Sequence, residues 1–303
     1  MESLMIATPG IPKATWFRMP PLRRFWGVLA LAAATVQLIA GGVMGARAFW
    51  LLVAVTIICC ALWIARHPQE QMAAKLIFTA LGFALACAAS SLYLAWAALA
   101  VPLKYDSALL SLDAALHISS FAIARAVWHS TLLAAFCRAV YASLELAIAA
   151  CWIGLSLSGS ARSARFIIAI LAAFGGGCLL YLLVPACGPA YAFPGFPFVA
   201  AAGKRSLMRL DGYPNCVPSL HLAAAMLIFR FRDGGWIGRA WPWLFLPLTA
   251  LATLSTGEHY AVDLILAVPF ALACEMAAER RWKPALVAAA ATLAPMLAIR
   301  LAV

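Results

Sequence analysis

The chain has 303 residues, of which 66% are hydrophobic and only 11% are charged. Soluble domains carry about 25% charged residues, so the composition excludes an ordinary soluble protein and favours an integral membrane protein. The formal net charge of +11 does not indicate nucleic-acid binding, because the basic residues are scattered between apolar runs and form no continuous stripe.

The N-terminal part of the chain predicts a short segment followed by membrane helices. Residues 1–24 combine four prolines with four basic residues, which predicts an irregular or interfacial cytoplasmic segment. They are not a cleavable signal peptide, because they lack an apolar stretch followed by a small-residue cleavage site. Apolar runs at about 25–43, 49–65 and 76–101 predict three transmembrane helices. Residues 25–103 would thus form an N-terminal membrane region.

Residues 105–126 have a different pattern from these runs. Acidic and basic side chains recur among leucines at helical spacing, which predicts an amphipathic helix lying in the membrane interface. The simplest interpretation of Asp106, Asp113 and His117 is a solvated helix face.

The second half of the chain predicts further membrane helices and one long connection. The spans fall at about residues 131–157, 166–184, 218–231, 241–255, 261–277 and 284–303. The fold class is therefore an all-α polytopic membrane bundle of about eight or nine transmembrane helices with an interfacial amphipathic helix. The proline- and glycine-rich connection at 185–217 suits an ordered re-entrant or capping loop.

Basic loops alternate along this succession of spans. Their distribution places the N-terminus in the cytoplasm by the positive-inside rule. The connections that precede His221 and surround His259 then emerge on the opposite face. The high alanine content hints at a bacterial inner membrane, which would make that face periplasmic.

Two histidines carry the chemistry that the sequence suggests. Antiparallel packing of the last spans would bring His221 and His259 to one end of the bundle. Asp263 follows His259 by four residues, so it would stack against the imidazole on one helix face. A carboxylate that accepts the Nδ1 proton makes Nε2 the stronger nucleophile, and a second imidazole can act as general acid and base. This set suits phosphoryl transfer.

Two other chemistries compete for the same residues. Ser/His/Asp acyl transfer would need a nucleophile elbow, and no GxSxG motif occurs. Zinc could bind His221, His259 and Asp263 by ligand type, but no residues stand at metal-ligand spacing. We therefore expect no metal and no cofactor.

Nine cysteines are present, and seven lie inside apolar runs as small buried side chains. Cys187 and Cys216 share the long polar connection. They could form a disulfide on an oxidising membrane face.

Two motifs resemble a known family. PSLH at 218–221 and HYAVD at 259–263 are similar to the second and third signature motifs of the type 2 phosphatidic acid phosphatase (PAP2) superfamily. The leucine in the first motif looks most like the branch of inositol phosphorylceramide and sphingomyelin synthases. Weaker similarity extends to the segment GPAY at 188–191 and to Asp106 with Asp113. The resemblance covers roughly residues 105–278.

The resemblance implies a fold and roles for the three residues. A six-helix PAP2-like catalytic core would occupy 104–278, followed at 279–303 by a basic segment and a last apolar helix. His259 would be the nucleophile that forms a phosphohistidine, Asp263 its orienting carboxylate, and His221 the general acid/base.

Departures from the phosphatase pattern favour a phosphodiester substrate. No KxxxxxxRP motif occurs, and Thr256 stands where phosphatases have an arginine. Fewer fixed cations suit a singly charged diester. The expected partners are a phospholipid donor and a lipid-alcohol acceptor such as ceramide within the bilayer. The candidate substrate-binding residues are Lys204, Arg205, Arg209, Ser219, Tyr191 and Tyr260.

Two alternatives to headgroup transfer stay open from the sequence. One is a lipid phosphate or pyrophosphate phosphatase of the same superfamily. The other is a non-catalytic membrane transporter or assembly subunit with a degenerate site.

Overall fold

The structure is a computed structural model that describes residues 89–90, 92–157, 160–199, 201–233 and 236–303. The predicted N-terminal segment, the spans at 25–43 and 49–65, and most of the span at 76–101 lie outside these residues. Everything below concerns the described part of the chain.

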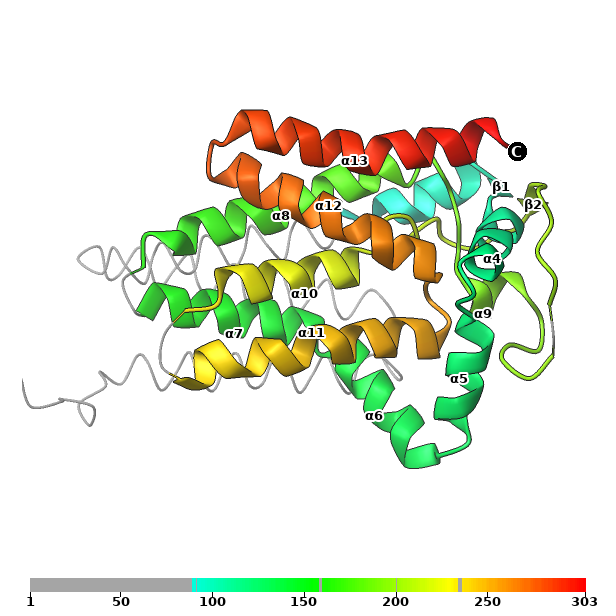
Figure 1. Cartoon of the computed structure of the whole chain (residues 1–303), viewed down its shortest axis with the longest axis horizontal. Coiled ribbons are helices and arrows are strands. Elements are labelled where there is room, and N and C mark those ends of the chain that lie inside the picture. The colour runs from blue at the N-terminus through cyan, green and yellow to red at the C-terminus, as the bar shows by residue number, and fades with distance from the viewer. Residues whose placement is uncertain (1–88, 91, 158–159, 200, 234–235) are drawn as a thin grey trace, which may run out of the picture. The chain divides into compact units, whose positions relative to one another are not determined.

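The described residues are mostly helical, which confirms the all-α prediction for this part of the protein (Figure 1). Residues 92–100 form a helix ahead of the first labelled element. The labelled elements are β1 Leu103–Lys104, α4 Asp106–Ala115, α5 Ser120–Trp128, α6 Thr131–Ala142, α7 Leu144–Leu157, α8 Arg162–Leu180, α9 Pro189–Ala192, β2 Met208–Arg209, α10 Leu220–Phe231, α11 Trp236–Thr256, α12 Ala261–Ala278 and α13 Trp282–Leu301. β1 and β2 pair antiparallel, with Leu103 opposite Arg209.

Three of the helices are long and apolar enough to cross a membrane: α8, α12 and α13. Two bent helix pairs, α4 with α5 and α6 with α7, pass the same test if each pair counts as one span. The described residues therefore offer three to five spans, which fits a membrane protein. The count of eight or nine for the whole chain stays a prediction.

The segment predicted as one interfacial helix is two helices at 88° to each other. α4 ends in a Schellman-type turn, in which the N–H of His117 bonds Ala114 O at 3.1 Å and the N–H of Ile118 bonds Asp113 O at 3.0 Å. His117 takes the left-handed conformation, with φ 56°, that such a turn requires. Ser119 then caps α5 by accepting from Ala122 N.

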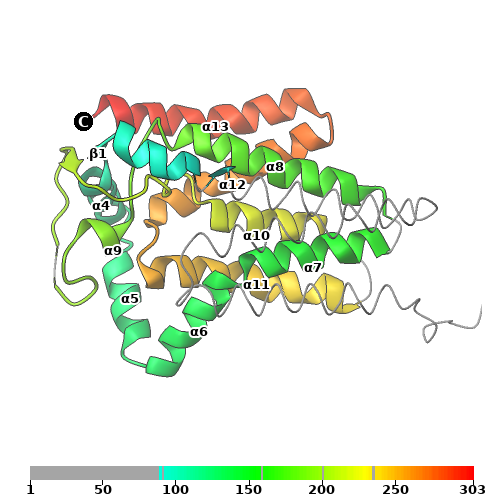
Figure 2. The same ribbon diagram turned by 180° about the vertical axis from the view of Figure 1, so that it is seen from behind.

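α10 lies inside the bundle, with contacts to α7, α8, α11 and α12 (Figures 1 and 2). Three consecutive alanines, at 223–225, are fully buried there, and small side chains allow helices in a membrane to approach closely. Phe166 of α8 packs on Phe231, the last residue of α10, with ring centroids 5.6 Å apart. Dispersion contacts of this kind hold helices together in lipid, where hydrophobic burial adds little.

α4 is fastened to the start of α12 by buried carboxylates. Asp113 accepts hydrogen bonds from the backbone N–H groups of Ala261 and Val262, at 2.9 and 3.0 Å. Those are orphan donors of the first turn of α12. Asp113 and Asp106 are both 0% exposed, so the predicted solvated helix face is wrong for these two residues. The reason is that each carboxylate finds backbone donors from elements distant in the sequence.

We expect Asp113→Ala to destabilise the protein by about 3 kcal/mol, because two bonds from buried N–H groups to a carboxylate are lost together. That loss corresponds to a Tm roughly 5–10 °C lower, measured by thermal unfolding in detergent. Asp211→Ala is the matched control, since Asp211 is exposed on the long connection. An unchanged Tm in Asp113→Ala would show that the cap contributes little.

Candidate active site

The two motif histidines lie at the same end of the helices. His221 is the second residue of α10, and His259 immediately precedes the N-cap of α12. Their ring centroids are 6.0 Å apart. Ser219 fixes the start of α10, because its hydroxyl accepts from Leu222 N at 3.3 Å and caps the helix. The structure therefore brings together the two side chains that the sequence placed at one end of the bundle.

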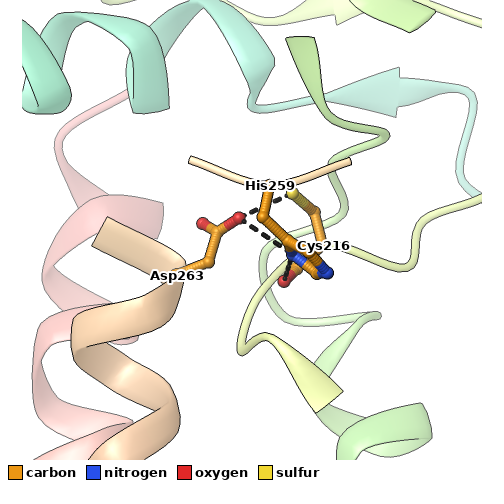
Figure 3. Close-up of side chains that lie close together, drawn as sticks. All are labelled: Cys216, His259 and Asp263. Carbon is orange, nitrogen blue, oxygen red and sulfur yellow. Dashed lines mark hydrogen bonds and ion pairs between the residues drawn. The ribbon is translucent and has the colours of Figure 1, made fainter. Parts of the chain in front are cut away.

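The ring of His259 is oriented through Nδ1 (Figure 3). Nδ1 lies 3.1 Å from the backbone carbonyl oxygen of Cys216 and 3.4 Å from Asp263 Oδ2. Both neighbours are acceptors, so they favour the tautomer with the proton on Nδ1 and leave the lone pair on Nε2. Asp263 was predicted from its spacing, whereas the nearer Cys216 carbonyl has no sequence signal.

Asp263 is itself held in place by several donors. Its Oδ2 accepts from the backbone N–H of Tyr260 at 2.8 Å and from Cys216 Sγ at 2.7 Å. The backbone carbonyl of Asp263 also accepts from Ser219 N at 3.3 Å, which links α12 to the start of α10. The carboxylate is 0% exposed. Its position relative to His259 is therefore set by backbone atoms as well as by the helix.

A second network positions the chain ahead of α9. Asp106 accepts from the N–H groups of Cys187 and Gly188 and from the hydroxyl of Tyr260, at 2.9 to 3.1 Å. The N–H of Ala190 bonds the carbonyl of Gly257 at 2.9 Å. The 188–191 segment thus rests on the turn that carries His259. The weak similarity noted at this segment corresponds to a structural contact with the site.

His221 stacks on Tyr141 of α6, with ring centroids 3.9 Å apart and an interplanar angle of 16°. Sequence reasoning missed Tyr141, because it lies in an apolar helix with no motif around it. The signal that could have found it is the pairing of Tyr141 with Arg138, three residues earlier on the same helix face.

A pocket of about 300 Å³ opens beside the histidines. Its lining consists of Trp128, Arg138, Tyr141, Thr256 and Glu258. It adjoins the site through Tyr141, which stacks on His221, and through Glu258, which precedes His259.

Glu258 bridges this pocket to the long connection. Its Oε1 accepts from the hydroxyl of Tyr191 at 2.8 Å. Burial raises the pKa of the Glu258 carboxyl, while the Tyr191 hydrogen bond and the nearby His259 lower it.

The predicted substrate-binding residues fall into three groups in the structure. Lys204, Arg205 and Arg209 are exposed on the long connection, and none of them lines the pocket. Ser219 and Tyr260 are fully buried and engaged in the contacts given above. Tyr191 is exposed and hydrogen-bonded to Glu258. Among the described cations, Arg138 is the one that the pocket presents.

Cys187 and Cys216 are both free, buried thiols, so the disulfide considered from the sequence is absent from the structure. Cys216 donates to Asp263, and the Cys187 side chain lies against Gly212. The Cys216 thiol therefore contacts the candidate site, whereas the Cys187 thiol packs within the long connection.

Cys216, His259 and Asp263 also present ligand atoms within 4.8 Å of one another. A metal would need the thiolate, and burial together with nearby carboxylates raises the pKa of the Cys216 thiol well above its ordinary value. The thiol proton is instead directed at Asp263. The arrangement fits a hydrogen-bonded orienting group better than a metal centre.

Comparison with known proteins places this site in a family. Residues 107–277, more than half of the chain, match the family model described as the PAP2 superfamily. The match agrees with the region of 105–278 expected from the two motifs. No curated protein matches the chain, and no solved structure does.

We expect Gly188→Ala to lower the Tm, because Gly188 combines a φ of 94° with a close approach to the site. A Cβ there would lie 2.4 Å from the backbone oxygen of Glu258, so either this segment or the His259 turn must move. The strain of an alanine at positive φ alone is about 1–2 kcal/mol.

Gly154→Ala in α7 is the matched control for this measurement, because a Cβ at Gly154 meets nothing within 4 Å. Thermal unfolding of both variants compares them directly. Equal Tm values would contradict the close packing of residues 188–191 on the turn.

Proposed function

Because the chain belongs to the PAP2 superfamily, whose members are generally phosphatases or phosphotransferases, we propose that it is a membrane lipid phosphotransferase. It would move a phospho-alcohol headgroup from a phospholipid to a lipid alcohol such as ceramide. The observation that supports this most strongly is the pair of imidazoles 6.0 Å apart, of which His259 is oriented through Nδ1.

The first half of the reaction forms a phosphohistidine. Nε2 of His259 attacks the phosphorus of the donor phosphodiester, and the bond from phosphorus to the lipid oxygen breaks. His221 gives its proton to the leaving alkoxide, so a diacylglycerol departs neutral. The two rings lie close enough, with centroids 6.0 Å apart, for both imidazoles to act on one phosphoryl group.

The second half reverses these roles. The hydroxyl of the acceptor lipid attacks the phosphorus, and His221 takes its proton. The bond between phosphorus and Nε2 breaks, which restores His259 and leaves the headgroup on the acceptor. Asp263 and the Cys216 carbonyl stabilise the imidazolium that His259 passes through.

Two features favour transfer over hydrolysis. The pocket has Thr256 and a single arginine where a doubly charged monoester would call for more cations. His259 is only 2% exposed, and exclusion of water is what allows an alcohol to compete as acceptor.

The remaining expectations accompany this proposal. We propose residues 104–278 as the catalytic core. The proposed setting is a bacterial inner membrane with a cytoplasmic N-terminus and the histidines on the periplasmic side. Hydrolysis by a lipid phosphatase is the outcome against which transfer is tested below.

His259→Ala should lower turnover by at least 10³-fold, because the nucleophile is lost.

His221→Ala should lower turnover of donors with an ordinary alcohol leaving group far more than turnover of a p-nitrophenyl phosphodiester, whose leaving group needs no proton. The control is His129→Ala, which changes an exposed histidine at the end of α5. Equal losses for both leaving groups would overturn the role given to His221.

Transfer and hydrolysis separate in one assay. A phospholipid labelled in its headgroup is offered to the purified protein with and without ceramide or another lipid alcohol. We expect label to appear in a new lipid when the acceptor is present. Label that reaches only water in every case would establish a phosphatase instead.

A further inference from the structure

The pocket beside the histidines is lined by two opposite charges that remain apart. Arg138 projects from α6, and Glu258 lies in the turn before α12. Within the described part of the chain, the recorded ion pairs are Arg230–Glu275, His259–Asp263 and Arg281–Glu279, so Arg138 and Glu258 are not paired with each other. Opposite charges that face one cavity without meeting can each receive a ligand group.

Arg138 lines the pocket with a side chain that is exposed at the surface of the described structure. It lies in α6, part of a bent helix pair apolar enough to span a membrane. Arginine in such a segment is rare and usually faces an internal partner or a binding site. A phosphate is the group that a guanidinium binds best, through parallel hydrogen bonds.

Glu258 offers a carboxylate to the same space. Its Oε1 is bonded to the Tyr191 hydroxyl, which uses one of the two carboxylate oxygens. The other oxygen can accept a hydrogen bond from a hydroxyl or an ammonium N–H, and a cationic group gains charge attraction in addition.

Aromatic rings complete the surroundings of a cation. Trp128 is fixed by the bond of its indole N–H to Ser255 O at 2.9 Å and by edge contacts with Phe196 and Phe198. Tyr141 is held by its stacking on His221. Tryptophan and tyrosine faces attract ammonium groups, most strongly where water is scarce.

Thr256 contributes no charge to the pocket. It occupies the position where the phosphatase pattern has an arginine, and it lines the pocket with a small hydroxyl. The remaining balance is one positive and one negative side chain.

We propose that this pocket binds a zwitterionic phospho-amine headgroup, with its phosphate at Arg138 and its ammonium group at Glu258 between Trp128 and Tyr141. This rests on the proposed function, whose donor it narrows to phospholipids with an ethanolamine- or choline-type headgroup. The two amines share the charge but differ in recognition: a primary ammonium donates hydrogen bonds, and a quaternary one relies on the rings.

The turnover test compares donors that differ only in the headgroup alcohol. We expect kcat/KM for phosphatidylethanolamine or phosphatidylcholine to exceed that for phosphatidylglycerol and phosphatidylinositol by at least about tenfold. Glu258→Gln should reduce this ratio toward one. Arg138→Ala should lower kcat/KM for all four donors alike, since the phosphate is common to them. Asp211→Asn removes an exposed carboxylate outside the pocket and should leave the ratio unchanged.

A binding test keeps this inference separate from the proposed function. Soluble glycerophosphocholine and glycerophosphoethanolamine should raise the Tm of the full-length protein, and glycerophosphoglycerol should not. Glu258→Gln should abolish that rise. Amine-selective binding with release of label only to water would refute transfer and keep the pocket. Transfer without a donor preference, or a preference unchanged in Glu258→Gln, would overturn the pocket and keep the transferase.

Discussion

The start of α12 is the point on which the candidate site depends. Its first turn carries Asp263, and its preceding residue is His259. Free N–H groups at a helix start must be satisfied, and here Asp113 of α4 accepts from two of them while Asp263 accepts from a third, that of Tyr260. The hydrogen bonds that cap the N-terminus of α12 therefore also fix the distance between the His259 imidazole and the Asp263 carboxylate. If α4 shifted, the orientation of His259 would shift with it.

Hydrogen bonds from distant elements hold the described residues of the long connection, 185–199 and 201–217, although few of them form regular structure. Backbone polar groups inside a membrane protein need internal partners, and the connection obtains them from Asp106, from the turn before α12 and from β1. The Cys216 carbonyl is one such backbone group, and its partner is the Nδ1–H of His259. The loop thus orients the proposed nucleophile with an ordinary backbone atom.

The sequence could predict the parts of the site that depend on local spacing. Asp263 follows His259 by one helical turn, and the antiparallel succession of apolar runs brings His221 to the same end. It could not predict partners that meet only through packing: Tyr141 on His221, Arg138 in the pocket, and the Cys216 carbonyl. These residues lie in apolar or proline-rich stretches, whose local pattern is equally typical of a plain membrane helix or loop.

In α4 the sequence pattern is clear, but the solvated helix face that it predicts is wrong. Acidic residues among leucines are typical of a helix with one wet face, yet Asp106 and Asp113 are fully buried.

The carboxylates at this end of the molecule differ in burial and in their hydrogen-bond partners. Asp106, Asp113 and Asp263 are 0% exposed, and backbone N–H groups supply hydrogen bonds to each of them. These hydrogen bonds hold the start of α12 and the chain ahead of α9 in place, and Asp263 also orients the His259 ring. Glu258 is only partly buried, and its recorded bond is to a side chain, Tyr191. A carboxylate that is not needed by the backbone, and that faces a pocket opposite an arginine, is available to select a substrate by charge.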